Sequence, residues 1–121
     1  MQSEVSPSLV PPLTPADAQA VAAFAHRLRQ SLGDHIVEIR LFGSKARGDA
    51  RPESDIDVLV VVQPETERVR LETAVSDLAF DVSLEHAVHI SPCVLTALVV
   101  HDSTWRDTPF LQTLEREGLR V

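Results

Sequence analysis

Two aspartates stand one residue apart at the head of an apolar run. Asp55 and Asp57 lead into a segment that is almost wholly apolar as far as Val62. Because side chains alternate between the faces of a strand, a strand here would direct both carboxylates to one side, about 6.5–7 Å apart. Such a pair can share a magnesium ion, which prefers oxygen ligands and typically takes one or two carboxylates together with phosphate oxygens. The alternative is that both aspartates form a turn in the preceding loop.

A glycine and a serine precede this pair, directly after an alternating segment at residues 35–42. Gly43 allows the backbone to approach a ligand closely, and Ser44 would open a short helix whose free N–H groups attract phosphate. Ordinary strand-to-helix turns also contain such pairs, so the signal is weak alone. Arg47 lies three residues beyond Ser44, on the same face of that helix, where its guanidinium could meet phosphates. Its alternative role is a surface salt bridge to an acidic side chain of the following loop.

Together these residues read Gly-Ser-x-Ala-Arg-Gly-x5-Ser-Asp-x-Asp, followed by an apolar strand. This combination closely resembles the signature of the DNA polymerase β-like nucleotidyltransferases, and above all the minimal nucleotidyltransferases of prokaryotes. Those are single short domains, often encoded beside a helical HEPN-domain partner. The resemblance covers about residues 14–121, although only residues 41–60 carry specific motif residues.

The resemblance assigns roles to the motif residues. It implies that Gly43 and Ser44 grip the triphosphate of a nucleoside triphosphate, with ATP as the expected nucleotide. It implies that Asp55 and Asp57 bind Mg²⁺ or Mn²⁺ and are catalytic. Further nucleotide-binding residues are expected at two more motif positions, Arg47 and Ser54.

The chain departs from the family pattern after its long helix. Active members usually carry a third carboxylate there, in a context like Val-Asp-Leu-Val, whereas residues 88–91 read Val-His-Ile-Ser. His89 therefore stands where the third acid is expected, and strand alternation predicts that it points toward Asp55 and Asp57. A neutral imidazole could accept a proton from an attacking hydroxyl as a catalytic base, but it would be a poor magnesium ligand.

Two functions follow from this pattern, and whether the chain is an enzyme stays open. In the first, the protein transfers a nucleoside monophosphate from a magnesium-bound triphosphate to an acceptor hydroxyl, which the resemblance to the antitoxin branch places on a partner protein. In the second, the protein is a catalytically weak or inactive antitoxin or regulatory subunit that acts by binding a HEPN-type partner. His89 is the main support for the second function. Both predict an oligomeric assembly.

Composition narrows the partners and the location. A chain of 121 residues with 44% hydrophobic residues fits one domain, which we expect over residues 14–121, after a flexible proline-rich leader over residues 1–13. A net charge of −7 disfavours long nucleic acid as a direct ligand. The single cysteine cannot form an intramolecular disulfide, and no apolar run approaches the roughly 20 residues that span a membrane. We therefore expect a cytoplasmic protein.

Local patterns predict the elements that hold these residues. Thr14 followed by Pro15 and Asp17 is typical of a helix start, and Gly33 supplies a left-handed stop. The remaining elements are predicted as a strand over 35–42, a central strand over 56–62, a helix over 64–86 with an acidic exposed face, a strand over 87–95, a helical turn over 102–107, a helix over 109–117 and a terminal strand over 119–121. This order predicts an α+β fold: a small mixed sheet with helices mainly on one face and the site at a sheet edge.

Overall fold

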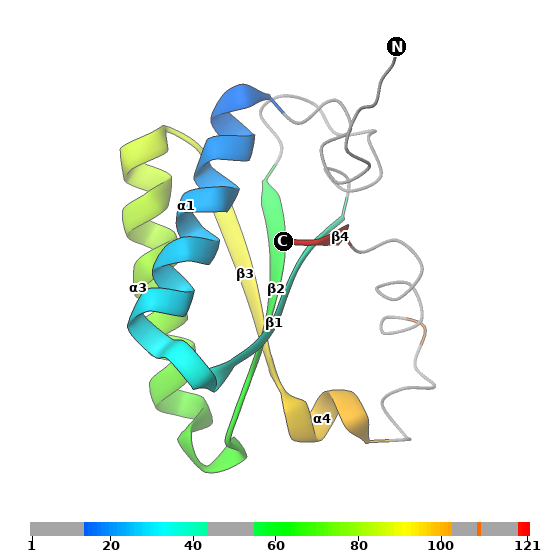
Figure 1. Ribbon diagram of the computed structural model, residues 1–121. Helices are drawn as coiled ribbons and strands as arrows, with labels where there is room; N and C mark the ends of the chain where they lie inside the picture. Colours follow the sequence, from blue (N-terminus) through cyan, green and yellow to red (C-terminus); the bar gives the residue numbers. More distant parts are fainter. Residues whose placement is uncertain (1–13, 44–54, 103–108, 110–118) are drawn as a thin grey trace.

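The computed structural model describes residues 14–43, 55–102, 109 and 119–121 (Figure 1). The elements are α1 (Pro15–Leu32), β1 (Ile36–Phe42), β2 (Ile56–Val62), α3 (Arg68–His86), β3 (Ile90–Thr96), α4 (Ala97–His101) and β4 (Leu119–Arg120), with short 3-10 turns at Gly33–His35 and Glu65–Glu67. The leader predicted for residues 1–13 lies outside this part of the chain. So do nearly all of the turn predicted for 102–107 and the helix predicted for 109–117.

The start of α1 follows the predicted capping pattern. The Thr14 side chain accepts a hydrogen bond of 3.0 Å from the backbone N–H of Asp17, and the Asp17 carboxylate accepts one of 3.2 Å from the backbone N–H of Thr14. Pro15 occupies the first helical position, where its missing N–H costs nothing. Gly33 ends the helix with a φ of 51° and a ψ of −122°. The predicted boundaries are confirmed, although this ψ lies outside the left-handed helical region.

Four strands form a mixed sheet in the order β3-β2-β1-β4. β1 pairs antiparallel with both β2 and β4, and β2 pairs parallel with β3. The predicted α+β class with a small mixed sheet is therefore confirmed, and the predicted terminal strand is β4. Pro92 fits because β3 is an edge strand, whose outer side needs no donor. The expectation that the site lies at a sheet edge is wrong in one respect, because Asp57 belongs to β2, an inner strand.

Both long helices cover the same face of the sheet (Figure 1). The even-numbered residues of β2 point into this layer and are almost completely buried. The helices contribute Phe24 and Leu28 from α1, and Leu71, Val75 and Val82 from α3. The other face carries a smaller cluster, in which Leu59 and Val61 pack against Phe42, Cys93, Leu95, Ala97 and Val100. β2 is thus covered on both faces, as its apolar run predicts.

Three surface features depart from a simple division into buried and solvated faces. Val37 does not join the buried face of β1, because a bulge between Ile36 and Glu38 turns it outward. Arg27 is not merely solvated but forms a two-pronged ion pair with Glu85 of α3. The prediction that the exposed face of α3 is acidic is wrong in part, since Phe80 and Leu84 are 63% and 67% exposed.

α4 was not expected at all. The chain leaves β3 directly into this short helix, and the Thr96 hydroxyl caps it by accepting a hydrogen bond of 3.3 Å from the backbone N–H of Val99. In the parts of the chain that the structure describes, no helix is long and apolar enough to cross a membrane.

Candidate functional site

The two aspartates lie on the sheet face that the long helices leave uncovered. Asp57 is the second residue of β2, and its parity matches Leu59 and Val61 of the smaller cluster. Asp55 directly precedes the strand and lies two residues before Asp57. Because side chains alternate along a strand, both carboxylates lie on the same side of the sheet. Asp57 is partly buried and Asp55 is exposed. The pair thus sits where β2 begins, with one carboxylate in the sheet and one at its rim.

Gly43 lies directly against Asp57. β1 ends at Phe42, which is the register partner of Asp57, and Gly43 follows with a φ of 77°. A Cβ atom built on Gly43 would overlap Asp57 Oδ2 and would lie 3.1 Å from its Cγ and 3.2 Å from its Cβ. Any side chain here would therefore both strain the backbone and displace the carboxylate. The glycine and the aspartate pair, predicted as separate features, meet at one place.

His89 contacts the outer aspartate. The backbone N–H of Ile56 donates to His89 O over 2.9 Å, which continues the β2–β3 ladder and places His89 beside Asp55. The imidazole Nδ1 lies 2.8 Å from Asp55 Oδ1, and the two side chains are 69% and 55% exposed. His89 thus contacts Asp55, one of the two aspartates toward which it was predicted to point. Because a carboxylate accepts, Nδ1 is assigned as the donor, and Nε2 of a neutral ring is left as an acceptor.

The donor set suits a hard cation. Asp55 and Asp57 offer carboxylate oxygens, and magnesium commonly uses one or two carboxylates while phosphate oxygens and water complete its six ligands. Within the described ranges, no group of three or more His, Cys, Asp or Glu side chains could hold a metal ion. The two carboxylates therefore suit a cation whose other ligands are phosphate oxygens and water. The nucleotide-binding positions predicted at Ser44, Arg47 and Ser54 lie outside the described residues.

The register between β2 and β3 places two further residues on the face that carries Asp57. Ser91 is the β3 partner of Asp57 and is partly buried on the same face. Cys93 follows two residues later beside Leu59. Burial raises the pKa of the Cys93 thiol, and the negative charges of Glu72 and Asp57 raise it further. The raised pKa and the packing of Cys93 against the smaller cluster favour a packing role over a nucleophilic one. The period of two from His89 was the signal for Ser91.

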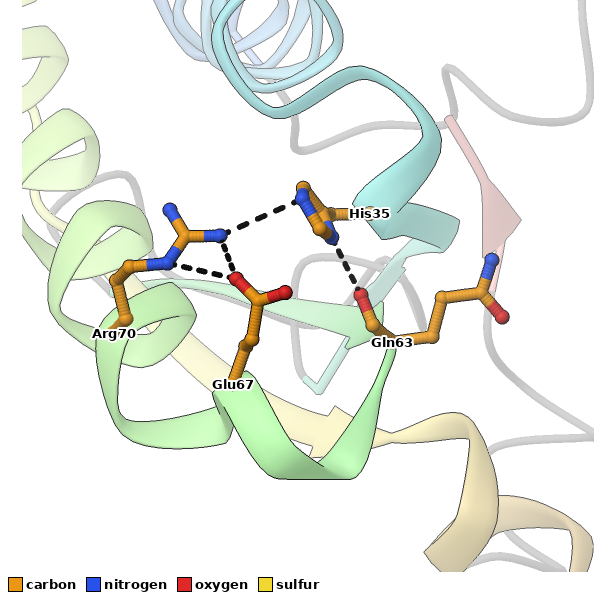
Figure 2. Close-up of polar contacts among 4 residues, drawn as sticks. All are labelled: His35, Gln63, Glu67 and Arg70. Atoms are coloured by element: carbon orange, nitrogen blue, oxygen red, sulfur yellow. Dashed lines mark hydrogen bonds and ion pairs between the residues drawn. The ribbon is translucent and has the colours of Figure 1, made fainter.

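A second polar cluster occupies the opposite end of the sheet (Figure 2). His35, just before β1, places Nδ1 2.8 Å from the backbone oxygen of Gln63, and its own backbone oxygen accepts from Gln63 N over 3.0 Å. Arg70 approaches His35 Nε2 at 3.4 Å and donates to Glu67 over 2.9 Å. The Arg70 hydrogen bond holds the pKa of Glu67 below its usual value. This cluster connects the open end of the β1–β2 pair to the start of α3.

Comparison with known proteins agrees with the geometry. A family model described as a nucleotidyltransferase domain matches residues 22–117. The chain is 30% identical over 103 residues to MJ0141 of Methanocaldococcus jannaschii, which is named as a candidate protein adenylyltransferase. That match covers 85% of this chain and 96% of MJ0141. A second protein of that organism with the same designation, MJ1305, is 32% identical over 73 residues, which cover 60% of this chain and 50% of MJ1305.

A solved structure described as that of a candidate minimal nucleotidyltransferase shares the fold, with a TM-score of 0.53 and 24% identity over 86% of this chain and 90% of that one. The family model, the relative matched over nearly its whole length and the shared fold lead to the same conclusion. The chain belongs to the nucleotidyltransferase domain family.

Proposed function

We propose that this protein transfers a nucleoside monophosphate from a magnesium-bound nucleoside triphosphate, ATP being the expected one, to a hydroxyl group on a partner protein. The observation that carries the proposal is the contact between the Gly43 backbone and the Asp57 carboxylate, at the start of a strand whose preceding residue is Asp55. Membership of the nucleotidyltransferase family supports the reaction class. The names of MJ0141 and MJ1305 support adenylate as the group and protein as the acceptor.

In this proposal Asp55 and Asp57 hold the divalent cation. A bound magnesium ion would neutralise phosphate charge and favour departure of pyrophosphate. Asp57 is fixed by its place in β2 and by the neighbouring Gly43 backbone, so its carboxylate is oriented before any ligand arrives. Asp55 lies at the rim, where an exposed carboxylate can turn toward a phosphate-bound cation. Ser44, Arg47 and Ser54 would contact the nucleotide.

His89 is the proposed proton acceptor. With Nδ1 donating to Asp55, the second ring nitrogen of a neutral imidazole is available to take a proton from an attacking hydroxyl. A carboxylate that orients a histidine through Nδ1 is a common arrangement for a general base. The exposure of the His89 side chain leaves room for a hydroxyl carried by another protein.

The contact between His89 and Asp55 also supports a second candidate function. Asp55 Oδ1 is already engaged by His89, and a histidine there supplies no third oxygen ligand. A regulatory subunit of the toxin–antitoxin kind, which binds a HEPN-type helical partner and transfers nucleotides slowly or not at all, would have little need for that ligand. The two functions predict different outcomes in one assay.

That assay combines the protein, labelled ATP, magnesium and the product of the neighbouring gene, and it follows label transfer and pyrophosphate release. Transfer to the partner that disappears in Asp57→Asn supports the enzyme. Binding to the partner with no transfer supports the regulatory subunit.

Calorimetry with ATP tests the site itself. Removing one carboxylate leaves the other and the phosphates as ligands, so Asp57→Asn should weaken magnesium-dependent binding by about 10–100-fold. Asp34→Asn, at the opposite end of the sheet, is the matched control and should bind as wild type does. Equal binding by wild type with magnesium and with excess chelator would refute the metal-bridged site.

A further inference from the structure

We infer that the outer face of α3 is a docking surface for an α-helix of another protein, apolar along one stripe and flanked by lysine or arginine. The observation behind this proposal is the unusual exposure of large apolar side chains on a helix that is otherwise well packed. Val69, Phe80 and Leu84 are 66%, 63% and 67% exposed. The surface goes beyond the proposed transferase activity and does not depend on it.

The exposed residues form a line. Val69, Thr73, Ser76, Phe80 and Leu84 are all exposed and follow one another at spacings of three or four residues, so they share one face of α3 over about four turns. We call this line the outer stripe. The inner stripe of the same helix, with Leu71, Val75 and Val82, is buried against the sheet. α3 therefore has two faces with apolar residues, and the fold uses only one of them.

The spacing indicates the shape of the partner. Side chains repeating every three or four residues form the ridge that packs into the groove of a second helix. Thr73 and Ser76 are small, which lets another helix approach between Val69 and Phe80. An isolated exposed leucine needs no explanation, but an aromatic and a leucine one turn apart on a straight ridge form a continuous apolar strip.

The charges beside the outer stripe indicate the chemistry of the partner. Asp77 and Asp81 border Phe80 and Leu84, and within the described ranges neither lies within ion-pair distance of a basic side chain, although the charge of Asp81 helps to raise the pKa of Arg27. The neighbouring Glu85, by contrast, is paired with Arg27. Basic side chains flanking the apolar stripe of a partner helix would meet these two exposed aspartates.

Two other occupants fit the charge less well. A second copy packed about a twofold axis would bring Asp77 and Asp81 of both chains to the same seam, where like charges repel. The leader over residues 1–13 contains Glu4 and no lysine or arginine. The same charge therefore disfavours the leader as an intramolecular cover.

The test uses two synthetic helical peptides that carry leucine along the same face. In one peptide this face is flanked by lysine, and in the other by glutamate. Each is titrated into the full chain without nucleotide, and binding is followed by backbone amide shifts. We expect the lysine peptide to shift amides along α3, to bind at least about tenfold tighter than the glutamate peptide, and to weaken as salt increases. Asp77→Asn combined with Asp81→Asn should remove most of the discrimination.

Phe80→Ser should weaken the lysine peptide by about tenfold or more. Leu98→Ser is the matched control, because Leu98 is 66% exposed on α4, away from the outer stripe. Both variants remove exposed side chains, so both should melt near the wild-type temperature. Failure of the lysine peptide to bind, equal binding of the two peptides, or equal effects of the two serine variants would overturn the proposal. A dimer of the protein alone that Phe80→Ser dissociates would overturn it in favour of a second copy.

Discussion

The two ends of the sheet each carry a histidine whose Nδ1 lies 2.8 Å from an oxygen, yet the two contacts differ in kind. At one end His35 bonds to a backbone carbonyl, and its own backbone bonds to the same residue, Gln63. At the other end His89 bonds to the Asp55 carboxylate, and both side chains are more than half exposed. A backbone oxygen is a fixed structural partner, whereas an exposed carboxylate can exchange its partner for a cation. One histidine, His35, thus links two elements at one end of the sheet, and we call this contact the clamp. The other, His89, lies in the candidate site.

The residues around the two histidines also differ, because those near His35 link separate elements and those near His89 surround the aspartate pair. Around His35 the contacts run between elements: Arg70 belongs to α3, and Thr96 at the end of β3 donates to Glu65 of the turn before α3. Around His89 the close approach is that of Gly43 to Asp57, which leaves no room for a side chain. We expect substitutions at the first end to change stability and substitutions at the second to change ligand binding.

The sharpest test compares two glycines with positive φ. Gly43→Ala adds a Cβ atom that overlaps Asp57 Oδ2, so the carboxylate must move. We expect magnesium-dependent ATP binding to fall by about 100-fold, measured by calorimetry, together with a stability loss of about 1–3 kcal/mol. Gly33→Ala, at φ 51° and ψ −122° with nothing within 4 Å, should cost about 1–3 kcal/mol of stability and leave binding unchanged. Equal binding losses in the two variants would show that backbone strain alone is responsible.

Exchange of the site histidine should have the next largest effect. His89→Asp places an oxygen donor beside Asp55, so we expect metal-dependent nucleotide binding to strengthen by about tenfold. His35→Asp at the other end is the matched variant and should leave binding unchanged. Titrations with magnesium at fixed ATP would measure both. If His89→Asp binds no better than wild type, the third donor comes from elsewhere in the chain or from a partner.

Removing the clamp should change stability and not binding. His35→Ala deletes the hydrogen bond to the Gln63 carbonyl, and Thr96→Val deletes the helix cap and the donor to Glu65. Each should lower the free energy of unfolding by about 1 kcal/mol in urea titrations. His89→Ala is the control and should unfold near the wild-type midpoint, because its side chain is exposed. A larger loss of unfolding free energy in His89→Ala than in His35→Ala would contradict the assignment of a structural role to His35.

The smallest expected effect is a pH dependence of stability that comes from the Glu67–Arg70 pair beside His35. Arg70 lowers the pKa of Glu67 in the folded protein, so the charged carboxylate contributes stability above its unfolded pKa of about 4.3. That contribution is lost as pH falls through the lower folded pKa. Because this pair is exposed, Glu67→Gln should melt within about 2 °C of wild type at pH 7. The difference should shrink as the pH falls through the lowered pKa of Glu67 in the folded protein. A difference that grows on acidification would show that another group is responsible.

Much of the architecture was predictable because its signals are local. The Thr14 cap, the apolar run of β2 and the inner stripe of α3 each depend on neighbours within one or two turns, and all three are confirmed. The side of β3 on which His89 lies followed from alternation alone. Local signals failed where packing decides, at the bulge that turns Val37 outward. The predicted end of α3 at His86 is confirmed, although Ala87 adopts a left-handed φ of 55° there without a glycine.

The amino-acid sequence alone therefore determined the motif, the element order and the identity of the acids, since residue type and spacing along the chain are enough to specify these. Only the tertiary structure decided which residues meet across the chain. Gly43 lies against Asp57 because β1 and β2 pair antiparallel, and His89 lies beside Asp55 because β2 and β3 pair parallel in that register. It also decided that Phe80 and Leu84 stay exposed, because α3 has two faces with apolar residues and the sheet can bury only one of them.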